Sequence, residues 1–440
     1  MNILIKNIQA LMNDEKETFV IKNVSLVIKG DTISKIIYDE VKDPSVLGTT
    51  FDKIIDGANK LVIPGLINCH THSYMAFMRN IMDDVPFMDW LFKGVMPIED
   101  NIMTEEDTYY GALLGMAEMI HSGTTCFNDM NVQINTAPKA AIAAGMRGFV
   151  SRGLVGEGDN QAGSDRLKWA FEEMDNFPNE ELVGFMLAPH APYTCDLEYM
   201  KIVSAKAKER GVGIHTHLSE SLSEIEQIKE KYNMTPIEMA EAGGLFDGLC
   251  VAAHCVQVTD SDIDIFAKHG VSVATNPVSN MKLGNGFAPV EKMLEKGVNV
   301  CLGTDGAASN NSLNFFHEMN ILSLIHKGVE KKADAMSAKT VLKIATINGA
   351  KALGIADKVG SISEGKKADL AILDSTALSL TPHNNLIGSL VYSANGTEVE
   401  TVLINGQIVM ENKQILTFNE DEVKAKCEEI SKRVLKELGR

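Results

Sequence analysis

Eight short apolar segments alternate with longer helical patterns between residue 61 and about residue 355, and this repeat constrains the fold more than any other feature. Nearly continuous apolar strands between helices are typical of a parallel sheet that is covered on both faces. Eight such units over about 290 residues predict a (β/α)8 TIM barrel, with a doubly wound open sheet as the alternative. The segments are LVIPGLINCH, TTCFND, GMRGFVSRG, LVGFMLAPH, GVGIHTH, LCVAAHC, GVSVATNP and GVNVCLGTD.

Both ends of the chain follow a different pattern, which is that of short strands separated by turns. Asn-Asp and Gly-Asp turn signals divide the first 60 residues, and strands return after about residue 355, where Asn405-Gly406 indicates a hairpin. A charged helix is predicted near the C-terminal end, over about 420–437. We predict one small β-sandwich domain, built from residues 1–60 and 356–440, around a barrel of residues 61–355.

Charge and cysteine content exclude several classes of protein. The 440-residue chain carries a net charge of −18. Binding to nucleic acid needs basic patches, so nucleic acid is not expected as a ligand. No apolar run approaches the roughly 20 residues that span a bilayer, and the N-terminal stretch lacks the apolar core of a signal peptide. The seven cysteines are scattered and contain no C-x-x-C, as is typical of reduced thiols. We predict a cytoplasmic protein that binds neither membrane nor nucleic acid.

Polar residues follow several of the predicted barrel strands at the point where each strand ends. A TIM barrel places its active site on that face, and two histidines spaced i, i+2 on an extended chain point the same way. Imidazole and carboxylate ligands suit Zn²⁺, with Fe²⁺, Mn²⁺, Co²⁺ or Ni²⁺ as further options. The sequence therefore predicts a metal site at the barrel mouth. Its candidate residues are His70, His72, His215, His217, His254 and Asp305.

The ordered motifs PGLINCHTH, HTHLSE, AHC and GTDGAASNN resemble the amidohydrolase superfamily, and GSISEGKKADLAIL resembles the family's return into its β-sandwich. The resemblance spans nearly the whole chain. It implies one divalent metal per chain, bound by His70, His72, His217 and Asp305. Dinuclear members carry a bridging lysine on strand four, but this strand ends in Ala188-Pro189-His190, so a mononuclear site is predicted. His215 is expected to be a hydrogen-bonded core histidine.

The resemblance also implies how the site acts. In related deaminases the glutamate that corresponds to Glu220 protonates the ring nitrogen beside the attacked carbon and then helps to deliver a proton to ammonia. Asp305 is expected to accept the proton of the attacking water, and His254 to orient it. A positioned acid/base of this kind is worth roughly 10²–10⁴ in rate. The H-x-E and P-C-x-x-C pair of the other zinc deaminases and the G-x-S-x-G of serine hydrolases are both absent.

The segment MAFMRNIMDDVPFMDWLFKGVMPIED resembles the corresponding loop of the methylthioadenosine/S-adenosylhomocysteine deaminases. The resemblance implies a hydrolase that converts the 6-amino group of an adenosine derivative to the inosine-type product, with a nucleoside as substrate and a homo-oligomeric assembly. Deamination of guanine-type bases or hydrolysis of aminotriazines, both found in the same branch, is the alternative. A non-catalytic scaffold paralogue is disfavoured, because such proteins typically lose metal ligands.

Residue by residue, the same resemblance implies a set of substrate contacts. Trp90 would cover the substrate, and Glu99 would bind the ribose hydroxyls through two acceptor oxygens. Arg152 and Arg166 would hold the amino-acid carboxylate of S-adenosylhomocysteine, since arginine pairs with carboxylates through two bonds. The remaining predicted contacts are His190 to the purine ring and Ser309 in the pocket near the metal.

Overall fold

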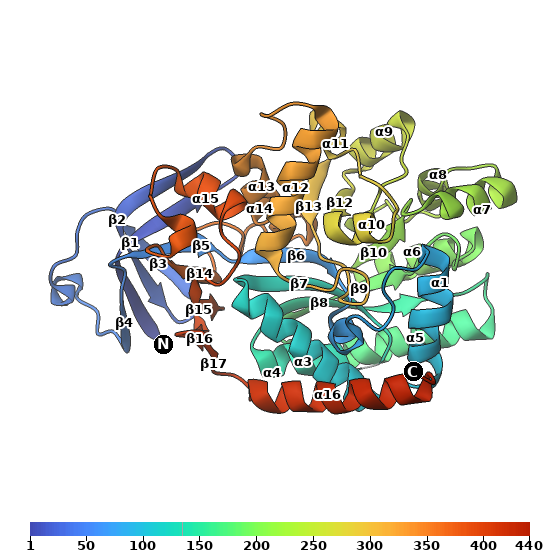
Figure 1. The fold of residues 1–440 in the computed structure, drawn as a ribbon, viewed down its shortest axis with the longest axis horizontal. Helices are drawn as coiled ribbons and strands as arrows, with labels where there is room; N and C mark the ends of the chain where they lie inside the picture. Colours follow the sequence, from blue (N-terminus) through green and yellow to red (C-terminus); the bar gives the residue numbers. More distant parts are fainter. Residues whose placement is uncertain (134) are drawn as a thin grey trace.

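The computed structural model describes residues 1–133 and 135–440 and consists of a barrel and a separate sheet from the two chain ends (Figure 1). The predicted (β/α)8 architecture is confirmed, because eight parallel strands run in the order β13-β12-β11-β10-β9-β8-β7-β6. These strands are β6 (Leu66–Thr71), β7 (Thr124–Asn131), β8 (Arg147–Leu154), β9 (Val183–Pro189), β10 (Gly213–Leu218), β11 (Cys250–His254), β12 (Ser272–Thr275) and β13 (Asn299–Leu302).

Hydrogen bonds bring the two edge strands of the barrel together at its mouth. The backbone N–H groups of Thr304 and Asp305, just past β13, both donate to the carbonyl of His70 on β6, at 3.0 Å each. The Asn68 amide also donates to the Thr304 hydroxyl at 2.7 Å. Backbone hydrogen bonds therefore hold His70 and Asp305, the first and the last predicted metal ligands, side by side, although they lie 235 positions apart in the sequence.

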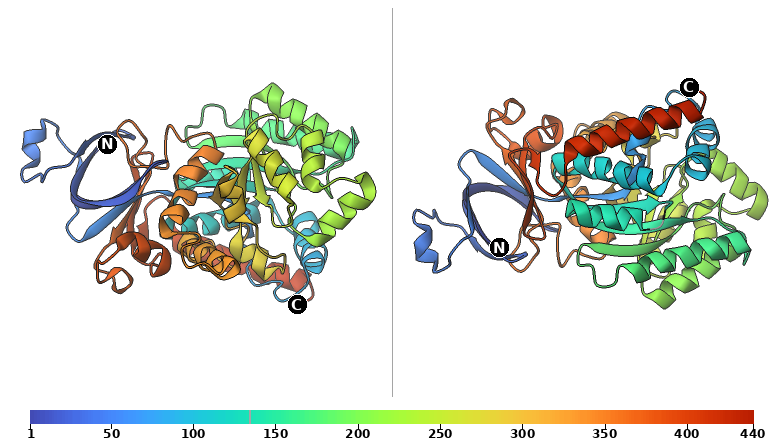
Figure 2. Two further views of the ribbon diagram at one scale, coloured as in Figure 1. Left: turned by 90° about the horizontal axis from the view of Figure 1, so that it is seen from above. Right: turned by 90° about the horizontal axis from the view of Figure 1, so that it is seen from below.

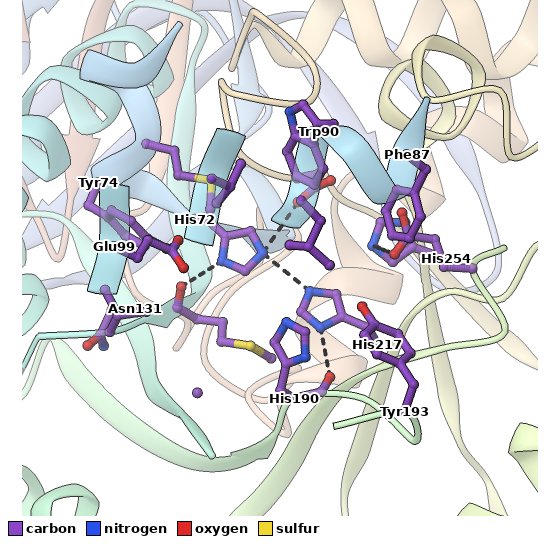
Figure 3. A pocket seen from close by; sticks show the side chains of 18 residues that line it. His72, Tyr74, Phe87, Trp90, Glu99, Asn131, His190, Tyr193, His217 and His254 are labelled. Atoms are coloured by element: carbon purple, nitrogen blue, oxygen red, sulfur yellow. Dashed lines mark hydrogen bonds and ion pairs between the residues drawn. The ribbon is translucent and has the colours of Figure 1, made fainter. Parts of the chain in front are cut away.

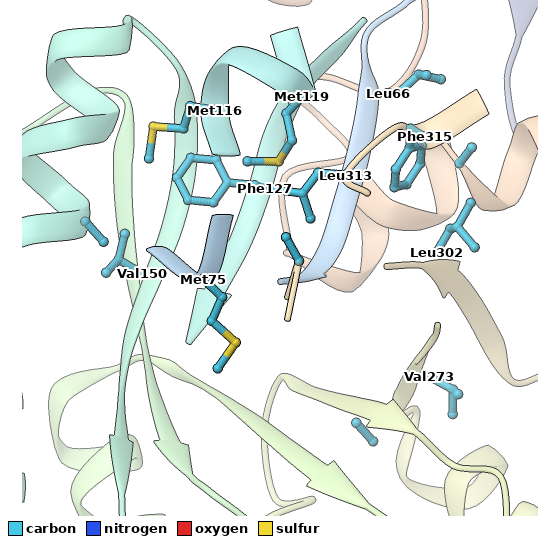
Figure 4. Packing of buried hydrophobic residues seen from close by; sticks show 14 of the residues in the cluster. Leu66, Met75, Met116, Met119, Phe127, Val150, Val273, Leu302, Leu313 and Phe315 are labelled. Atoms are coloured by element: carbon cyan, nitrogen blue, oxygen red, sulfur yellow. The ribbon is translucent and has the colours of Figure 1, made fainter. Parts of the chain in front are cut away.

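Helices surround the barrel, and its apolar core lies between strands and helices (Figures 2 and 4). Those of the first half are α1 (Phe87–Asp89), α2 (Met96–Asn101), α3 (Glu105–His121), α4 (Thr136–Ala144), α5 (Gln161–Asn176), α6 (Leu197–Arg210), α7 (Leu222–Tyr232) and α8 (Pro236–Ala242). Those of the second half are α9 (Asp260–His269), α10 (Pro277–Lys282), α11 (Val290–Glu295), α12 (Phe315–Glu330), α13 (Ala338–Ile344), α14 (Ile347–Ala352), α15 (Leu386–Tyr392) and α16 (Glu420–Glu437).

The second body is one mostly antiparallel sheet to which both chain ends contribute, as the sequence predicts. Its strands follow the order β17-β16-β15-β14-β5-β1-β2-β3, and β4 pairs with β1. Its own apolar core includes Ile3, Leu26 and Leu370. The strands are β1 (Asn2–Asn13), β2 (Thr18–Lys29), β3 (Thr32–Ile37), β4 (Lys53–Asp56), β5 (Lys60–Pro64), β14 (Leu370–Asp374), β15 (Val399–Ile404), β16 (Gln407–Glu411) and β17 (Gln414–Ile415).

The segment LVIPGLINCH, expected to be one barrel strand, is in fact divided between the two bodies. Its first half lies in β5 of the terminal sheet, and its second half is β6 of the barrel. The division falls at Gly65, where a Cβ atom would lie 2.0 Å from Oγ1 of Thr125. A side chain cannot fit there, so glycine lets the chain pass closely against β7 as it enters the barrel.

The predicted C-terminal helix is α16, which packs along α3 at the outside of the barrel (Figure 1). Its buried side chains are spaced three or four residues apart, as expected for one apolar helix face. They are Val423, Cys427, Ile430 and Val434. Among the described residues, no helix is both long and apolar enough to cross a membrane.

Candidate metal centre and active site

Three imidazoles and one carboxylate meet at the barrel mouth, and Figure 3 shows two of these imidazoles, His72 and His217, beside each other. The Nε2 atoms of His72 and His217 lie 3.2 Å apart, and Oδ1 of Asp305 lies 3.4 Å from Nε2 of both His70 and His72. All four side chains are buried. They come from β6, from β10 and from the turn after β13, so the structure brings together the ligand set that the sequence predicts.

The donor set fits a divalent cation. Nδ1 of His72 donates to the carbonyl of Met130, and Nδ1 of His217 to that of His190, at 2.8 Å each. A carbonyl only accepts, so the Nε2 atoms keep free lone pairs toward the cluster. Among the described residues, Nε2 of His70 is buried without a hydrogen-bond partner, which is the state expected of a ligand atom. Burial lowers the pKa of His70 to about 4 and keeps it neutral.

Asp305 is held so that one of its oxygens faces the histidines. The other oxygen, Oδ2, accepts hydrogen bonds from the hydroxyls of Ser279 and Ser309, at 2.7 Å each. The backbone of Asp305 has a φ of +60°, a left-handed conformation that is costly for a side-chain-bearing residue and is concentrated at functional sites. Ser309 therefore contacts Asp305, a predicted metal ligand, on the carboxylate oxygen that faces away from the histidines. The predicted contact of Ser309 with the substrate stays a prediction.

Glu220 and His254 form the wall next to this cluster. Oε2 of Glu220 lies 3.7 Å from Nε2 of His254, and Oε1 accepts from the Asn285 amide at 2.9 Å. Nδ1 of His254 donates to Oδ1 of Asn280 at 2.8 Å. Burial, together with the charge of Asp305, raises the pKa of Glu220 well above its usual range. Glu220 can therefore hold a proton inside the pocket.

The cluster opens into a pocket at the barrel mouth. Trp90, Glu99 and His190, to which the resemblance assigns substrate contacts, line this pocket, and Figure 3 shows Glu99 and His254 on opposite sides of it. The Trp90 indole donates to the carbonyl of Ala308 at 3.0 Å, which fixes the ring over the pocket. Burial raises the pKa of Glu99 to about 7, opposed by the hydrogen bond that it accepts from the Tyr74 hydroxyl.

The two predicted carboxylate-binding arginines come from β8 and α5. Arg152 lies two residues before the end of β8, beside Gly153, which lines the pocket, and its guanidinium lies 5.0 Å from the centre of the Trp169 ring. Nε of Arg152 is buried without a partner among the described residues. Arg166 lies on α5, and its charge is one of the causes, after burial, that lower the pKa of His190. Neither arginine lines the pocket in the described part of the chain, so their predicted contacts with a substrate carboxylate stay predictions.

Sequence reasoning missed several residues that build the site. Tyr74 and Tyr193 line the pocket, and Asn280 and Asn285 hold His254 and Glu220. The tyrosines lie two and three residues after predicted site histidines, so proximity in sequence was an available signal. Asn280 and Asn285 follow the seventh barrel strand, and only the barrel closure brings them to strands five and six.

A closed (β/α)8 barrel with a buried histidine and aspartate cluster at its strand ends defines a class of metal-dependent hydrolases. Within that class, the Amidohydrolase family profile matches residues 61–409 of this chain. The match covers more than half of the sequence, and the chain belongs to the amidohydrolase family.

Comparison with individual proteins gives full-length relatives. The chain is 43% identical over 439 residues to a 5-methylthioadenosine/S-adenosylhomocysteine deaminase of Thermoanaerobacter pseudethanolicus, covering 99% of this chain and 100% of the relative. A protein of the same name from Caldanaerobacter subterraneus is 44% identical over 426 residues, 96% of each chain. The crystal structure of an adenosine deaminase from Xanthomonas campestris, with bound zinc, superposes with a TM-score of 0.92, at 29% identity and 98% coverage of both chains.

Proposed function

We propose that this protein is a metal-dependent deaminase that hydrolyses the 6-amino group of 5'-methylthioadenosine and S-adenosylhomocysteine to the inosine-type products and ammonia. One observation carries the proposal: a single buried pocket has a proton-holding carboxyl group, Glu220, beside the cation cluster, and a second buried carboxyl group, Glu99, on another part of its wall. The full-length relatives that bear this activity in their names support it.

The cation is proposed to be one Zn²⁺ per chain, held by His70, His72, His217 and Asp305. Three nitrogen donors and one oxygen donor suit zinc, and the similar adenosine deaminase of Xanthomonas campestris has zinc bound. When bound in such a site, the cation lowers the pKa of water and so supplies the nucleophile at neutral pH. The barrel strands keep the four donors in place before any substrate arrives.

The residues of the chain are proposed to perform the remaining steps. Trp90 covers the base, His190 hydrogen-bonds to the purine, and Glu99 accepts hydrogen bonds from the ribose hydroxyls. Glu220 gives its proton to the ring nitrogen beside the attacked carbon while Asp305 takes a proton from water. His254 stabilises the charge that develops at the attacked carbon. Glu220 then takes up the proton of the hydroxyl group formed at the attacked carbon and passes it to the departing amine, which leaves as ammonia as the carbonyl forms. The proton held by Asp305 returns Glu220 to its protonated state.

Arg152 and Arg166 are proposed to bind the amino-acid carboxylate of S-adenosylhomocysteine at the pocket mouth. The unpartnered buried Nε of Arg152 supports this role, since a buried donor without a partner is costly unless a ligand satisfies it. Ser309 is proposed to act through Asp305, against which its hydroxyl lies.

The test is a substrate screen with the purified, zinc-loaded protein. Ammonia release is measured with methylthioadenosine, S-adenosylhomocysteine, adenosine, guanine and an aminotriazine at equal concentrations. The proposal expects the highest kcat/KM with the first two compounds. Higher kcat/KM with guanine or the triazine would assign the alternative function of the same branch. No ammonia from any of the five would reject a deaminase of this kind.

Cytoplasmic location and homo-oligomeric assembly are part of the proposal. All seven cysteines are buried free thiols, which supports a reducing compartment. Light scattering of the purified protein would test the assembly, because a mass of one chain contradicts it.

A further inference from the structure

His70 differs from His72 and His217, the other two imidazoles of the cation cluster, in the partner of its outer nitrogen. The Nδ1 atoms of His72 and His217 each donate to a backbone carbonyl oxygen at 2.8 Å. Such oxygens only accept, so the hydrogen of each of these rings is fixed on Nδ1. Nδ1 of His70 instead lies 2.8 Å from Nε2 of His215, a nitrogen that can either donate or accept.

Ser151 resolves this ambiguity. Its hydroxyl donates its single hydrogen to the backbone carbonyl of Asp129, at 2.7 Å. The Ser151 oxygen also lies 3.2 Å from Nδ1 of His215 and, having used its hydrogen, can only accept there. His215 must therefore carry its hydrogen on Nδ1. Its Nε2 is then an acceptor, and it receives the hydrogen bond from Nδ1 of His70.

The end of this chain of hydrogen bonds is the cation cluster. With its hydrogen on Nδ1, His70 keeps a free lone pair on Nε2, the buried atom that has no partner and lies 3.4 Å from Oδ1 of Asp305. In the other tautomer of His215, its Nε2 would carry the hydrogen and donate to Nδ1 of His70. The hydrogen of His70 would then lie on its Nε2, inside the cluster. A metal ligand needs a lone pair at that position.

We propose that Ser151 and His215 are positioning residues of the cation site: the Ser151 hydroxyl selects one tautomer of His215, which keeps Nε2 of His70 available to a divalent cation. Ser151, His215 and His70 lie on three different strands, β8, β10 and β6, and all are buried. The inference rests on the cation site of the proposed function and not on its substrate.

The test measures zinc affinity by competition with a chelator, in the full-length protein and three variants. Ser151→Ala should weaken zinc binding about tenfold, the lower end of the range for loss of a direct partner of a metal ligand, because Ser151 acts on His70 only through His215. His215→Gln should stay within a few-fold of the unmodified protein, because its amide oxygen can only accept from His70. Adding Ser151→Ala to His215→Gln should change the zinc affinity little further, since glutamine at position 215 has no imidazole tautomer for Ser151 to select.

Ser323→Ala is the matched control, because Ser323 is a buried serine that also donates to a carbonyl, that of Met336 at 2.8 Å, and forms no hydrogen bond to a histidine of the described residues. Its zinc affinity should be unchanged. A second readout is the ¹⁵N spectrum of the imidazoles in metal-free protein, where Ser151→Ala should move hydrogen from Nδ1 to Nε2 of His70.

Two results would overturn the inference. One is zinc affinity in Ser151→Ala equal to that of the unmodified protein. The other is an equal loss from Ser151→Ala with and without His215→Gln, which would assign Ser151 a purely structural role. An unmodified protein that retains no zinc would reject the proposed cation site as well. If the nucleosides were not substrates, the deaminase function would be rejected by the ammonia assay, but zinc binding would be unaffected. The proposed function and the role of Ser151 and His215 are therefore rejected by different measurements.

Discussion

The inner and outer ends of the pocket are built differently. At the inner end, the side chains project from barrel strands or the turns directly after them, and each outer ring nitrogen or carboxylate oxygen has a protein partner. At the outer end, Trp90, Glu99 and Arg166 come from short helical segments or from α5. The comparison indicates that the barrel strands fix the reacting groups. Recognition of the substrate depends on helical segments whose sequence can change without disturbing the barrel.

The largest effect is expected at the inner end. His217→Ala removes a proposed ligand, so the zinc content should fall from one per chain toward none and turnover should fall to background. Elemental analysis and ammonia release measure both. His269→Ala is the control, because His269 lies on α9 and pairs with Glu241 away from the cluster. If His217→Ala had full activity without bound zinc, the metal cluster would not be needed for the reaction, which would contradict this prediction.

Glu220→Gln should be nearly as severe but in a different way. The amide keeps the shape of the side chain yet cannot transfer the proton, so kcat should fall roughly 10²- to 10⁴-fold. Zinc should remain bound, which distinguishes this variant from His217→Ala. Glu226→Gln is the matched control, because Glu226 is an exposed glutamate on α7, the helix that begins just after Glu220. A rate within tenfold of the unmodified protein would exclude Glu220 as the acid.

The outer end predicts selective losses. Arg152→Met and Arg166→Met each remove a charged hydrogen bond, worth about 1.5–3 kcal/mol, so kcat/KM for S-adenosylhomocysteine should fall roughly tenfold to 150-fold. Methylthioadenosine lacks the carboxylate, and its kcat/KM should change little. Equal losses with both substrates would indicate damage to α5 or β8 and would contradict the division between the two ends.

The smallest effect is expected for Tyr74→Phe. The Tyr74 hydroxyl donates to Glu99, and loss of one hydrogen bond of about 0.5–1.5 kcal/mol should raise KM for ribosides about twofold to tenfold, with kcat retained. Tyr199→Phe is the control, because that buried tyrosine donates to the carbonyl of Gly163 outside the pocket wall. A large fall in kcat instead would mean that the outer end takes part in the reaction.

The sequence predicts the inner end better than the outer end for a physical reason. His70, His72, His217 and Asp305 stand at the ends of apolar strands, and the barrel fold by itself directs such positions to one face. The assignments at Trp90, Glu99 and the two arginines depended on resemblance, since nothing in their spacing indicates that α2, α5 and β8 meet at one pocket.

Other features could not be read from the sequence because they depend on contacts between distant segments. The apolar run through Gly65 looks like a single strand, and only the close approach to Thr125 shows where it divides. Ser151 carries no motif, and its importance comes from the order of hydrogens along a path over three strands. The positive φ of Asp305 is equally invisible, since among the described aspartates only Asp84 and Asp305 have a positive φ and no shared motif marks them.

The pairing of β5 with β14 has a consequence for how the chain is made. One edge of β5 bonds to β1 soon after synthesis, but its other edge bonds to Leu370–Asp374, which the ribosome delivers about 300 residues later. At roughly 5–20 residues per second, that edge stays open for about 15–60 s. An apolar strand with a free edge is a template for wrong pairing. For this period the free edge of β5 is open to wrong pairing, and a chaperone that covers this edge would prevent it.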